Sequence, residues 1–400
     1  MPWRQTKPMN ERAHFAFACE SELYSMTELC RQYGISRKTG YKWLARYRQE
    51  GVSGLAEHSR APQTCPHRMP LDVETALREE RGNHPHWGPR KLLARLAVNQ
   101  PELAERLPAA STVGDLLKRV GLVEARKRRS RPVHSGASPL KQVATAPNDV
   151  WSVDFKGEFR TQDSCLCYPL TVSDALSRYL LACDGLSSTA YEGTQSAFEQ
   201  LFGRVGLPLA IRSDNGAPFC SQAIGGLSRL SVWWMKLGIV HQRIKPGKPQ
   251  QNGRHERMHR TLKAETARPP AEDHKRQQER FDAFRKEYNE LRPHEALGMK
   301  TPAAIWTPPT RSLPASLPEP VYSGHMEIRS VRHNGEIKFL GQRLFLSETL
   351  AHERVALEEV EDGVWSLFFY NNLLARLDQR NMRFVSAGTV APAEPDKPAA

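Results

Sequence analysis

Apolar and polar residues follow two different periods along the chain, and the change between them divides it into three regions. Up to about residue 122, the apolar positions and the residues that begin and end helices predict helical units. From residue 150 onwards, short alternating runs predict β-strands, with helical spacing at 190–204. Residues 321–378 alternate again like strands, with turns at Asn334-Gly335 and Asp362-Gly363. The pattern therefore predicts all-α, mixed α/β and small all-β parts, in that order.

The first helical unit is typical of a helix-turn-helix. A short helix from Met26 to Tyr33 stops at Gly34, and Ser36 caps a second helix from Arg37 to Arg48. The apolar anchors expected on the second helix are Tyr41, Trp43, Leu44 and Tyr47. The cations expected to face DNA are Arg37, Lys38, Lys42 and Arg46. The alternative is an ordinary helical hairpin with a basic solvent-facing side.

A second, weaker unit follows. Trp87-Gly88-Pro89 begins a helix from Arg90 to Leu96, and Ser111 is expected to cap a helix from Thr112 to Val120 that stops at Gly121. The intervening residues 97–110 are too many for a short turn, which favours a winged or widened variant. This unit either contacts DNA or has a purely structural role.

The middle region predicts a mixed sheet with helices packed on it. Strands are expected at 150–157, 168–174 and 179–184 as an antiparallel meander, followed by the helix at 190–204 and a buried strand at 207–213.

Three acidic residues of this region are candidates for a metal site. Asp154 lies within the first strand, Asp214 lies where the fourth strand ends, and Glu256 lies early in a helix that also carries Arg260 and Lys263 on one face. Carboxylate oxygens from two strands and a helix start suit two Mg²⁺ ions in a phosphoryl displacement. Arg260 and Lys263 would then hold DNA phosphates beside the metal ions. Taken singly, Asp214 is also explained as a turn residue and Glu256 as a surface partner of arginines.

Charge is concentrated towards the amino terminus. The chain has 57 Lys and Arg against 44 Asp and Glu, and residues 1–150 hold 25 of the basic and 15 of the acidic ones, which is +10 of the net +13. The densest run includes Arg126, Lys127, Arg128 and Arg129. These residues are expected either to bind phosphates or to be part of a solvated linker.

Composition excludes several classes of protein. Mean hydropathy is −0.58, and no apolar run approaches the ~18–20 residues needed to cross a bilayer. The first fifteen residues lack the apolar stretch of a signal peptide. The seven cysteines form no CxxC pair, so zinc is not indicated. We therefore expect a cytoplasmic, nucleoid-associated protein of more than one domain, without a membrane partner.

Four separated motifs resemble those of insertion-sequence transposases of the retroviral-integrase superfamily. They are Trp151–Asp154, Ser213–Gly216 with Phe219, Gln251–Arg257, and the set Tyr288-Asn289, Arg292–His294, Leu297-Gly298 and Thr301-Pro302. The resemblance covers about residues 20–310. It implies a ribonuclease H-like catalytic domain with a mixed five-stranded sheet, a catalytic and metal-binding triad of Asp154, Asp214 and Glu256, and two Mg²⁺ ions or Mn²⁺. It also implies that Lys263 touches the transposon end.

The chain departs from retroviral integrases in two ways. The 41 residues between Asp214 and Glu256 exceed the family's usual spacing, which predicts an insertion around 221–236. The zinc-binding amino-terminal domain of those integrases is absent, and helix-turn-helix units take its place.

The expected organisation has six parts: a helix-turn-helix domain (1–60), a second such domain or winged variant (70–123), a basic linker (124–147), the catalytic domain (148–310), a small β-barrel (320–380) and a disordered tail (387–400). The expected function is transposition: binding of terminal inverted repeats, metal-dependent 3′-end cleavage and strand transfer to target DNA, by at least a dimer. The alternatives are a nuclease of the same fold without strand transfer, and a DNA-binding regulator whose catalytic-like domain is inert.

Overall fold

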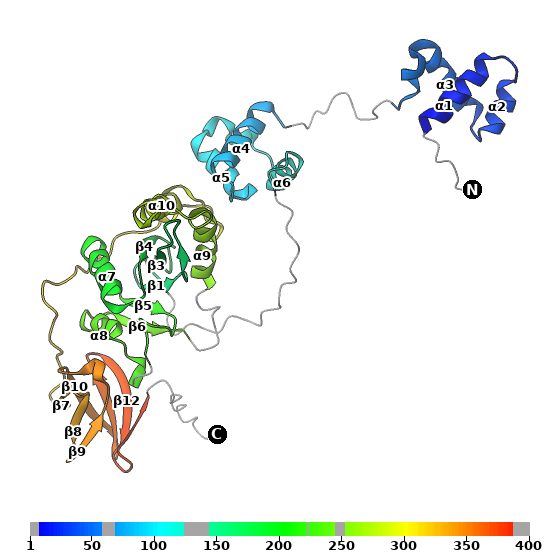
Figure 1. The fold of residues 1–400 in the computed structure, drawn as a ribbon. Helices are drawn as coiled ribbons and strands as arrows, with labels where there is room; N and C mark the ends of the chain where they lie inside the picture. Colours follow the sequence, from blue (N-terminus) through cyan, green and yellow to red (C-terminus); the bar gives the residue numbers. More distant parts are fainter. Residues whose placement is uncertain (1–7, 58–68, 124–143, 222–223, 245–252, 387–400) are drawn as a thin grey trace, which may run out of the picture. The chain divides into compact units, whose positions relative to one another are not determined.

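The computed structural model describes residues 8–57, 69–123, 144–221, 224–244 and 253–386 (Figure 1). The chain forms two compact units, Met1–Met69 and Pro70–Ala400. Most of the predicted basic linker, with Arg126, Lys127, Arg128 and Arg129, and the predicted tail at 387–400 lie outside the described residues. Among the helices that the structure describes, none is both long and apolar enough to cross a membrane.

The first unit contains three helices, α1 (Pro8–Glu20), α2 (Met26–Gln32) and α3 (Arg37–Glu50), followed by a 3-10 turn at Gly51–Leu55. The two helices predicted from the sequence are confirmed. Ser25 and Glu28 form a capping box on α2, and Ser36 accepts the Thr39 N–H at the start of α3. Gly34 has a φ of +63° between them, a conformation that glycine adopts without strain.

Tyr41 was predicted to be a packing anchor of α3, and this is wrong, because its side chain is 52% exposed. The predicted anchors Trp43 and Leu44 are confirmed as buried, Tyr47 is partly buried, and Gly40 also belongs to the buried face of α3. A Cβ at Gly40 would lie 2.7 Å from the Cys30 sulfur, so α2 approaches α3 at this small residue. That close contact turns the neighbouring Tyr41 towards solvent.

Residues 69–123 form a second group of helices, α4 (Leu71–Asn83), α5 (Pro89–Asn99) and α6 (Ala110–Arg119), with a 3-10 turn at Pro101–Arg106. The predicted cap at Ser111 is wrong. The helix begins at Ala110, two residues before the predicted start at Thr112, and Ala109 at its N-cap gives no side-chain hydrogen bond. The wing is not found either, since residues 69–123, all of them described, contain helices and no strand.

The middle region is a mixed sheet of β1 (Val150–Phe155), β2 (Phe159–Arg160), β3 (Leu166–Asp174), β4 (Leu180–Leu186), β5 (Ala210–Ser213) and β6 (Val240–Arg243). The predicted meander is confirmed: β3 pairs antiparallel with both β1 and β4. On the other side of β1, β5 and then β6 continue the sheet in parallel. The sheet has six strands instead of five because the two-residue β2 pairs with the start of β3.

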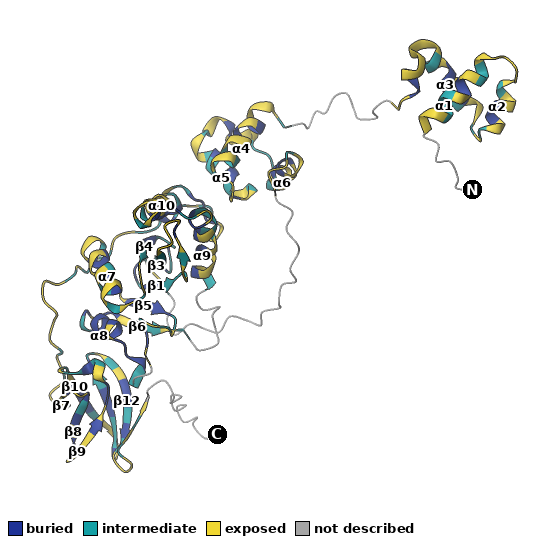
Figure 2. Ribbon diagram, in the orientation of Figure 1, coloured by how far each residue is buried: buried dark blue, intermediate teal, exposed yellow. Residues whose placement is uncertain are grey.

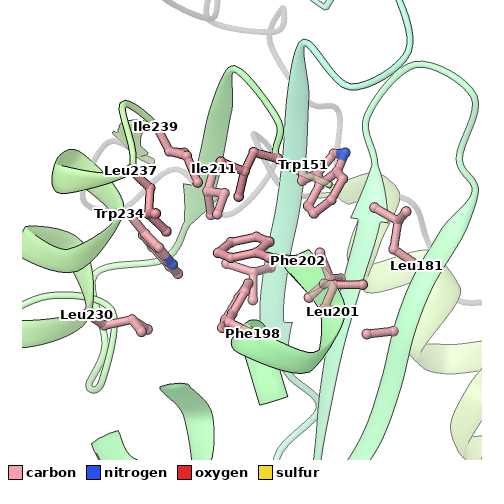
Figure 3. Close-up of a cluster of buried hydrophobic side chains, with 14 of the residues drawn as sticks. Trp151, Leu181, Phe198, Leu201, Phe202, Ile211, Leu230, Trp234, Leu237 and Ile239 are labelled. Atoms are coloured by element: carbon pink, nitrogen blue, oxygen red, sulfur yellow. The ribbon is translucent and has the colours of Figure 1, made fainter. Parts of the chain in front are cut away.

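Helices cover both faces of this sheet (Figure 1). On one face, α7 (Tyr191–Val205) and α8 (Arg229–Lys236) bury aromatic side chains, including Phe198, Phe202 and Trp234, against Trp151 and Ile211 of the strands (Figure 3). On the other face, α9 (Gly253–Thr266) and α10 (His274–Lys286) pack Met258, Leu262, Phe281 and Phe284 against the strand residues Cys167, Leu180 and Cys183. The inner strands β1, β3 and β5 are accordingly buried along most of their length (Figure 2).

An insertion was expected around 221–236, but residues 229–236 of that segment form α8. Leu230, Trp233 and Trp234 of α8 belong to the core of the sheet. This part of the segment is therefore an element of the folded core and not an added surface loop.

The carboxyl-terminal region contains two antiparallel sheets instead of one closed barrel. A five-stranded sheet has the order β13-β12-β11-β10-β7, and β8 and β9 form a separate hairpin. The strands are β7 (Glu327–Ser330), β8 (Glu336–Phe339), β9 (Gln342–Phe345), β10 (Arg354–Glu361), β11 (Val364–Phe369), β12 (Asn372–Asp378) and β13 (Arg383–Ser386). The predicted turns at Gly335 and Gly363 are confirmed, with φ of +78° and +75°. Both sheets share one core, which also contains Val232 and Met235 of α8.

Candidate active site

Strand alternation decides which side chains of β1 reach the candidate site. Trp151 and Val153 enter the core beneath α7 and α8. Because successive side chains of a strand point to opposite faces, Ser152 and Asp154 point to the face that α9 covers. β1 and β5 are parallel, with Ser152 paired to Arg212, so Asp154 and Asp214 lie near the same carboxyl ends of neighbouring strands. α9, which carries Glu256, packs against β1.

Asp154 is in an environment that disfavours its negative charge. Its side chain is 21% exposed. Burial, and then the nearby charge of Asp214, raise the pKa of Asp154 to about 7, and Glu256 also contributes to the rise. The three predicted acids are therefore electrostatic neighbours. A bound cation would relieve their mutual repulsion, which is the behaviour expected of a carboxylate metal site.

Asp214 is held by the turn that follows β5. Its Oδ1 accepts the Gly216 N–H at 3.1 Å, and the Asn215 side chain donates to the Ile244 carbonyl just beyond β6. A Cβ at Gly216 would lie 3.1 Å from Asp214 Oδ2, so glycine leaves room for the carboxylate. The predicted Asp-Asn-Gly motif thus fixes the position of Asp214.

Glu256 lies in the first turn of α9. The burial pattern places Glu256, Arg260 and Lys263 on the exposed side of the helix, as predicted from their spacing. Among the residues that the structure describes, no group of three His, Cys, Asp or Glu side chains is arranged closely enough to hold a metal ion. The acids are thus brought near one another without forming a closed metal cluster.

The buried side of α9 carries two histidines that the sequence interpretation missed. His255 and His259 contact Thr171 of β3 with their Nε2 atoms, at 2.7 and 2.6 Å from its Oγ1. Burial lowers the pKa of His255 to about 3. Burial, and then His255, lower the pKa of His259 to about 2. Their i,i+4 spacing was the available signal, since it places both rings on one helical face.

Arginines outside the predicted set also lie close to this helix start. The Arg254 Nη1 donates to the Ala175 carbonyl at 3.0 Å. Burial, followed by the charges of Arg254 and Arg257, lowers the pKa of Arg178. A concentration of cations beside the acidic residues suits a polyanionic ligand.

The motif at 288–302 supports the fold and does not join the acidic residues. The Asn289 side chain forms hydrogen bonds with both backbone groups of Leu180 on β4. Arg292, whose side chain is 6% exposed, pairs with Glu265 of α9 at 2.9 Å. The motif therefore anchors the last part of the domain to a strand and to the helix that carries Glu256.

In the first unit, the predicted DNA-facing cations lie on α3. Arg37, Lys38 and Lys42 are exposed, while Arg46 is half-buried. Lys42 and Arg46 both lie over the Trp43 ring, at 4.7 and 5.2 Å from its centroid. The stems of these two residues cover an otherwise apolar ring, which leaves Arg37 and Lys38 as the more freely available cations.

Models of protein families match most regions of the chain. The integrase core domain matches residues 144–249 and 237–302. A helix-turn-helix domain matches residues 11–62, and a homeodomain-like domain matches residues 39–117. The carboxyl-terminal domain of IS481 family transposases matches residues 326–383.

Curated relatives include bacterial and viral proteins. A protein of insertion element IS476 from Xanthomonas euvesicatoria is 31% identical over 191 residues, which is 45% of this chain and 50% of the relative. A protein of insertion element IS407 from Burkholderia multivorans is 29% identical over 194 residues, 47% of this chain and 65% of the relative. The Gag-Pol polyprotein of baboon endogenous virus is 29% identical over 199 residues, 49% of this chain and 10% of the polyprotein. The chain thus spans less than two thirds of these relatives.

Solved structures that resemble the chain include an intasome of simian T-cell lymphotropic virus in complex with the PP2A regulatory subunit B56 gamma. Its TM-score is 0.37 at 18% identity, and the match covers 70% of this chain and 97% of that one. The HTLV-2 integrase catalytic core domain in complex with magnesium has a TM-score of 0.31 at 19% identity, covering 41% of this chain and all of that one. Similarity at this level is too weak to add to the family matches. The family matches show that the chain contains an integrase core domain, and together with the insertion-element relatives they make it similar to bacterial insertion-sequence transposases of the integrase superfamily.

Proposed function

We propose that the chain is a DNA transposase that binds the terminal inverted repeats of a mobile element, cleaves at the 3′ ends and transfers them to target DNA. The integrase core and the helix-turn-helix regions support this function. The single observation that carries it is the placement of Asp154 and Asp214 at the carboxyl ends of the paired parallel strands β1 and β5, beside the helix that carries Glu256, and the raised pKa of Asp154 agrees with it. A bound cation would offset the repulsion between these carboxylates, which favours a metal-dependent reaction.

Asp154, Asp214 and Glu256 would hold two Mg²⁺ ions, or Mn²⁺ in their place. Their carboxylate oxygens are the hard donors that these ions prefer. A pair of such ions stabilises the attacking and leaving oxygens of an in-line phosphoryl displacement. The turn at Gly216 keeps the Asp214 carboxylate in place, and β1 keeps Asp154 beside it.

The reaction consists of two displacements at phosphorus. In the first, a water oxygen displaces the 3′-oxygen at the element end. In the second, the freed 3′-hydroxyl oxygen displaces a 3′-oxygen of the target strand. In both steps the exposed Arg260 and Lys263 of α9 hold DNA phosphates next to the acids. No bond between protein and DNA forms in either step.

The first helix-turn-helix domain would grip the repeat through Arg37, Lys38, Lys42 and Arg46, and the segment with Arg126, Lys127, Arg128 and Arg129 would add phosphate contacts. We propose division into domains at 1–60, 70–123, 148–310 and 320–380. Because two element ends are joined together, at least a dimer acts. The chain would work in the bacterial cytoplasm, on nucleoid DNA.

The test uses the full chain, a duplex carrying the element end, a target plasmid and Mg²⁺. Wild-type protein is expected to nick the duplex and to give joined products with the plasmid. Asp154→Asn, Asp214→Asn and Glu256→Gln should each abolish both products while leaving binding of the duplex unchanged. Wild-type strand transfer by any of the three would show that the triad is assigned incorrectly.

The same assay separates the rival functions. Nicked duplex without plasmid-joined product would indicate a nuclease of this fold. Tight binding of the duplex by the wild type, with no Mg²⁺-dependent cleavage at all, would indicate a regulator with an inert catalytic domain.

A further inference from the structure

A single hydroxyl group joins the strand of Asp154 to the helix of Glu256. Thr171 Oγ1 lies 3.0 Å from the backbone carbonyl oxygen of Asp154 on the neighbouring strand. The same oxygen is 2.7 Å from His255 Nε2 and 2.6 Å from His259 Nε2. The two rings lie edge to face, with centroids 4.6 Å apart. Three backbone segments, on β1, β3 and α9, therefore converge on one atom.

The chemistry of these groups fixes where the hydrogens are. A threonine hydroxyl has one hydrogen to donate, and the Asp154 carbonyl oxygen can only accept. The hydroxyl therefore donates to Asp154, and both Nε2 atoms carry hydrogens that they donate to Thr171. This assignment holds whatever the charge of either ring, because Nε2 is protonated in each case.

The remaining ring nitrogens face polar partners as well. Ser173 Oγ lies 2.9 Å from His255 Nδ1, which secures the first ring to a second position on β3. His259 Nδ1 lies 3.7 Å from Asp154 Oδ2. His259 is thus tied to the main chain of Asp154 through Thr171 and lies beside the carboxylate of the same residue.

We propose that His255, His259 and Thr171 are positioning residues that fix the start of α9 on β3 and thereby set the approach of Glu256 to Asp154. This role rests on the proposed metal-dependent function. Glu256 is exposed, so its place depends on where the backbone of the first turn of α9 is held. His255 is adjacent to it in the sequence, and His259 is one turn further along.

Packing alone does not explain two imidazoles at these sites. Met258 and Leu262 of the same helix fill the neighbouring core with apolar side chains. A buried imidazole is favourable only when its polar atoms are hydrogen-bonded, and hydrogen bonds, unlike apolar contacts, fix direction as well as distance. The network therefore supplies the directional constraint that an apolar contact could not give to a metal-binding helix.

The experiment compares Thr171→Val, which removes the hydroxyl at nearly constant shape, with Thr171→Ser, which keeps it. Binding of Mn²⁺ to the full chain is measured by isothermal titration calorimetry, together with thermal unfolding. Loss of groups that orient metal ligands weakens metal binding by roughly 10–100-fold. We expect Thr171→Val to weaken Mn²⁺ binding at least tenfold, by the same reasoning, and Thr171→Ser to restore it. The Mg²⁺ concentration for half-maximal nicking should shift in parallel.

A second readout follows the rings directly. In the full chain with ¹⁵N-labelled histidine, the signals assigned through His255→Gln and His259→Gln should show protonated Nε2 in both rings. A proton on Nδ1 alone in either ring would overturn the network. A Thr171→Val protein with a lower unfolding temperature but unchanged Mn²⁺ affinity would overturn the positioning role and leave only a structural one. A wild-type chain that binds no Mn²⁺ would instead overturn the proposed function, and the role that rests on it.

Discussion

Thr171 is the register partner of Asp154 in the antiparallel pair of β1 and β3, and its hydroxyl donates to the carbonyl oxygen of Asp154. Residues paired across two strands point to the same face of the sheet. The candidate metal ligand and the residue that contacts the two histidines of α9 are therefore neighbours because of strand register. A shift of β3 by one residue would turn Thr171 into the opposite core and separate the strand from the helix.

The stability of the metal-free protein should fall as the pH rises through neutrality. The pKa of Asp154 in the folded chain is about 7, above the value of about 3.9 expected in the unfolded chain. The resulting stabilisation is fully present below about pH 4 and is lost as the pH rises through about 7, with an upper limit on the order of 4 kcal/mol. The free energy of unfolding of Asp154→Asn, measured with urea and tryptophan fluorescence, should not show this fall as the pH rises. The control Asp115→Asn, at a side chain that is 76% exposed, should retain it. Identical pH profiles for wild type and Asp154→Asn would contradict the raised pKa.

Mg²⁺ should stabilise the protein more at pH 8 than at pH 6. At pH 6 the ion competes with the proton on Asp154, whose pKa is about 7, and at pH 8 the carboxylate is already charged. The measurement is the rise in thermal midpoint with Mg²⁺ concentration at the two pH values. Asp214→Asn should reduce the rise at both. Equal apparent affinity for Mg²⁺ at pH 6 and pH 8 would count against Asp154 as a ligand.

Gly216→Ala should impair cleavage while leaving the fold intact. The added Cβ would lie 3.1 Å from an oxygen of the Asp214 carboxylate and push it aside. We expect nicking of the element end to fall by about tenfold or more, as for other changes that displace a metal ligand. Gly193→Ala is the matched control, because a Cβ there meets nothing within 4 Å. Equal activity of the two variants would show that Asp214 tolerates the displacement.

Lys42→Ala should weaken the binding of DNA by the chain to a similar extent for every DNA sequence, the element end included. Lys42 is exposed on α3. The loss of one phosphate contact lowers the slope of the logarithm of the binding constant against the logarithm of the salt concentration by about one. Fluorescence anisotropy at several salt concentrations measures this slope. Lys275→Ala, on α10 next to Glu272 and Asp273, should leave it unchanged. A Lys42→Ala slope equal to that of the wild type would remove Lys42 from the proposed DNA contact.

Arg292→Ala should destabilise the protein strongly. The side chains of Arg292 and Glu265 are 6% and 17% exposed, so the substitution leaves a largely buried carboxylate without its partner. Removal of one member of a buried pair costs about 3–5 kcal/mol. The surface pair of Arg276 and Glu279 offers a control: because both side chains are largely exposed, Arg276→Ala should leave stability nearly unchanged. Comparable urea midpoints for the two variants would refute the structural role assigned to Arg292.

Local patterns in the sequence were enough to predict the elements that carry the acids. Asp154 follows alternating residues in β1, and Asp214 precedes a recognisable turn, so their approximate places could be read from neighbours in the chain. Glu256, Arg260 and Lys263 were placed on one face by helical spacing alone. Their nearness to one another depends on the parallel pairing of β1 with β5, which the predicted mixed sheet left unspecified and the structure shows.

The missed features depend on contacts between distant residues. The link from His255 and His259 to Thr171 spans more than 80 positions, so no local pattern reveals it. Tyr41 was misplaced because the packing of α2 against Gly40 rotates the buried face of α3. The closed barrel was predicted from strand spacing, but pairing divides those strands into two sheets.

The helix α8 is only eight residues long and is enclosed on two sides. Leu230 and Trp234 lie in the core of the mixed sheet, whereas Val232 and Met235 lie in the core of the carboxyl-terminal strands. Its connections lead from β5, the strand before Asp214, to β6, where the Asn215 side chain is anchored at Ile244. One short helix is therefore part of both hydrophobic cores, so a substitution in α8 that disturbs the carboxyl-terminal strands would also disturb the sheet that carries Asp154.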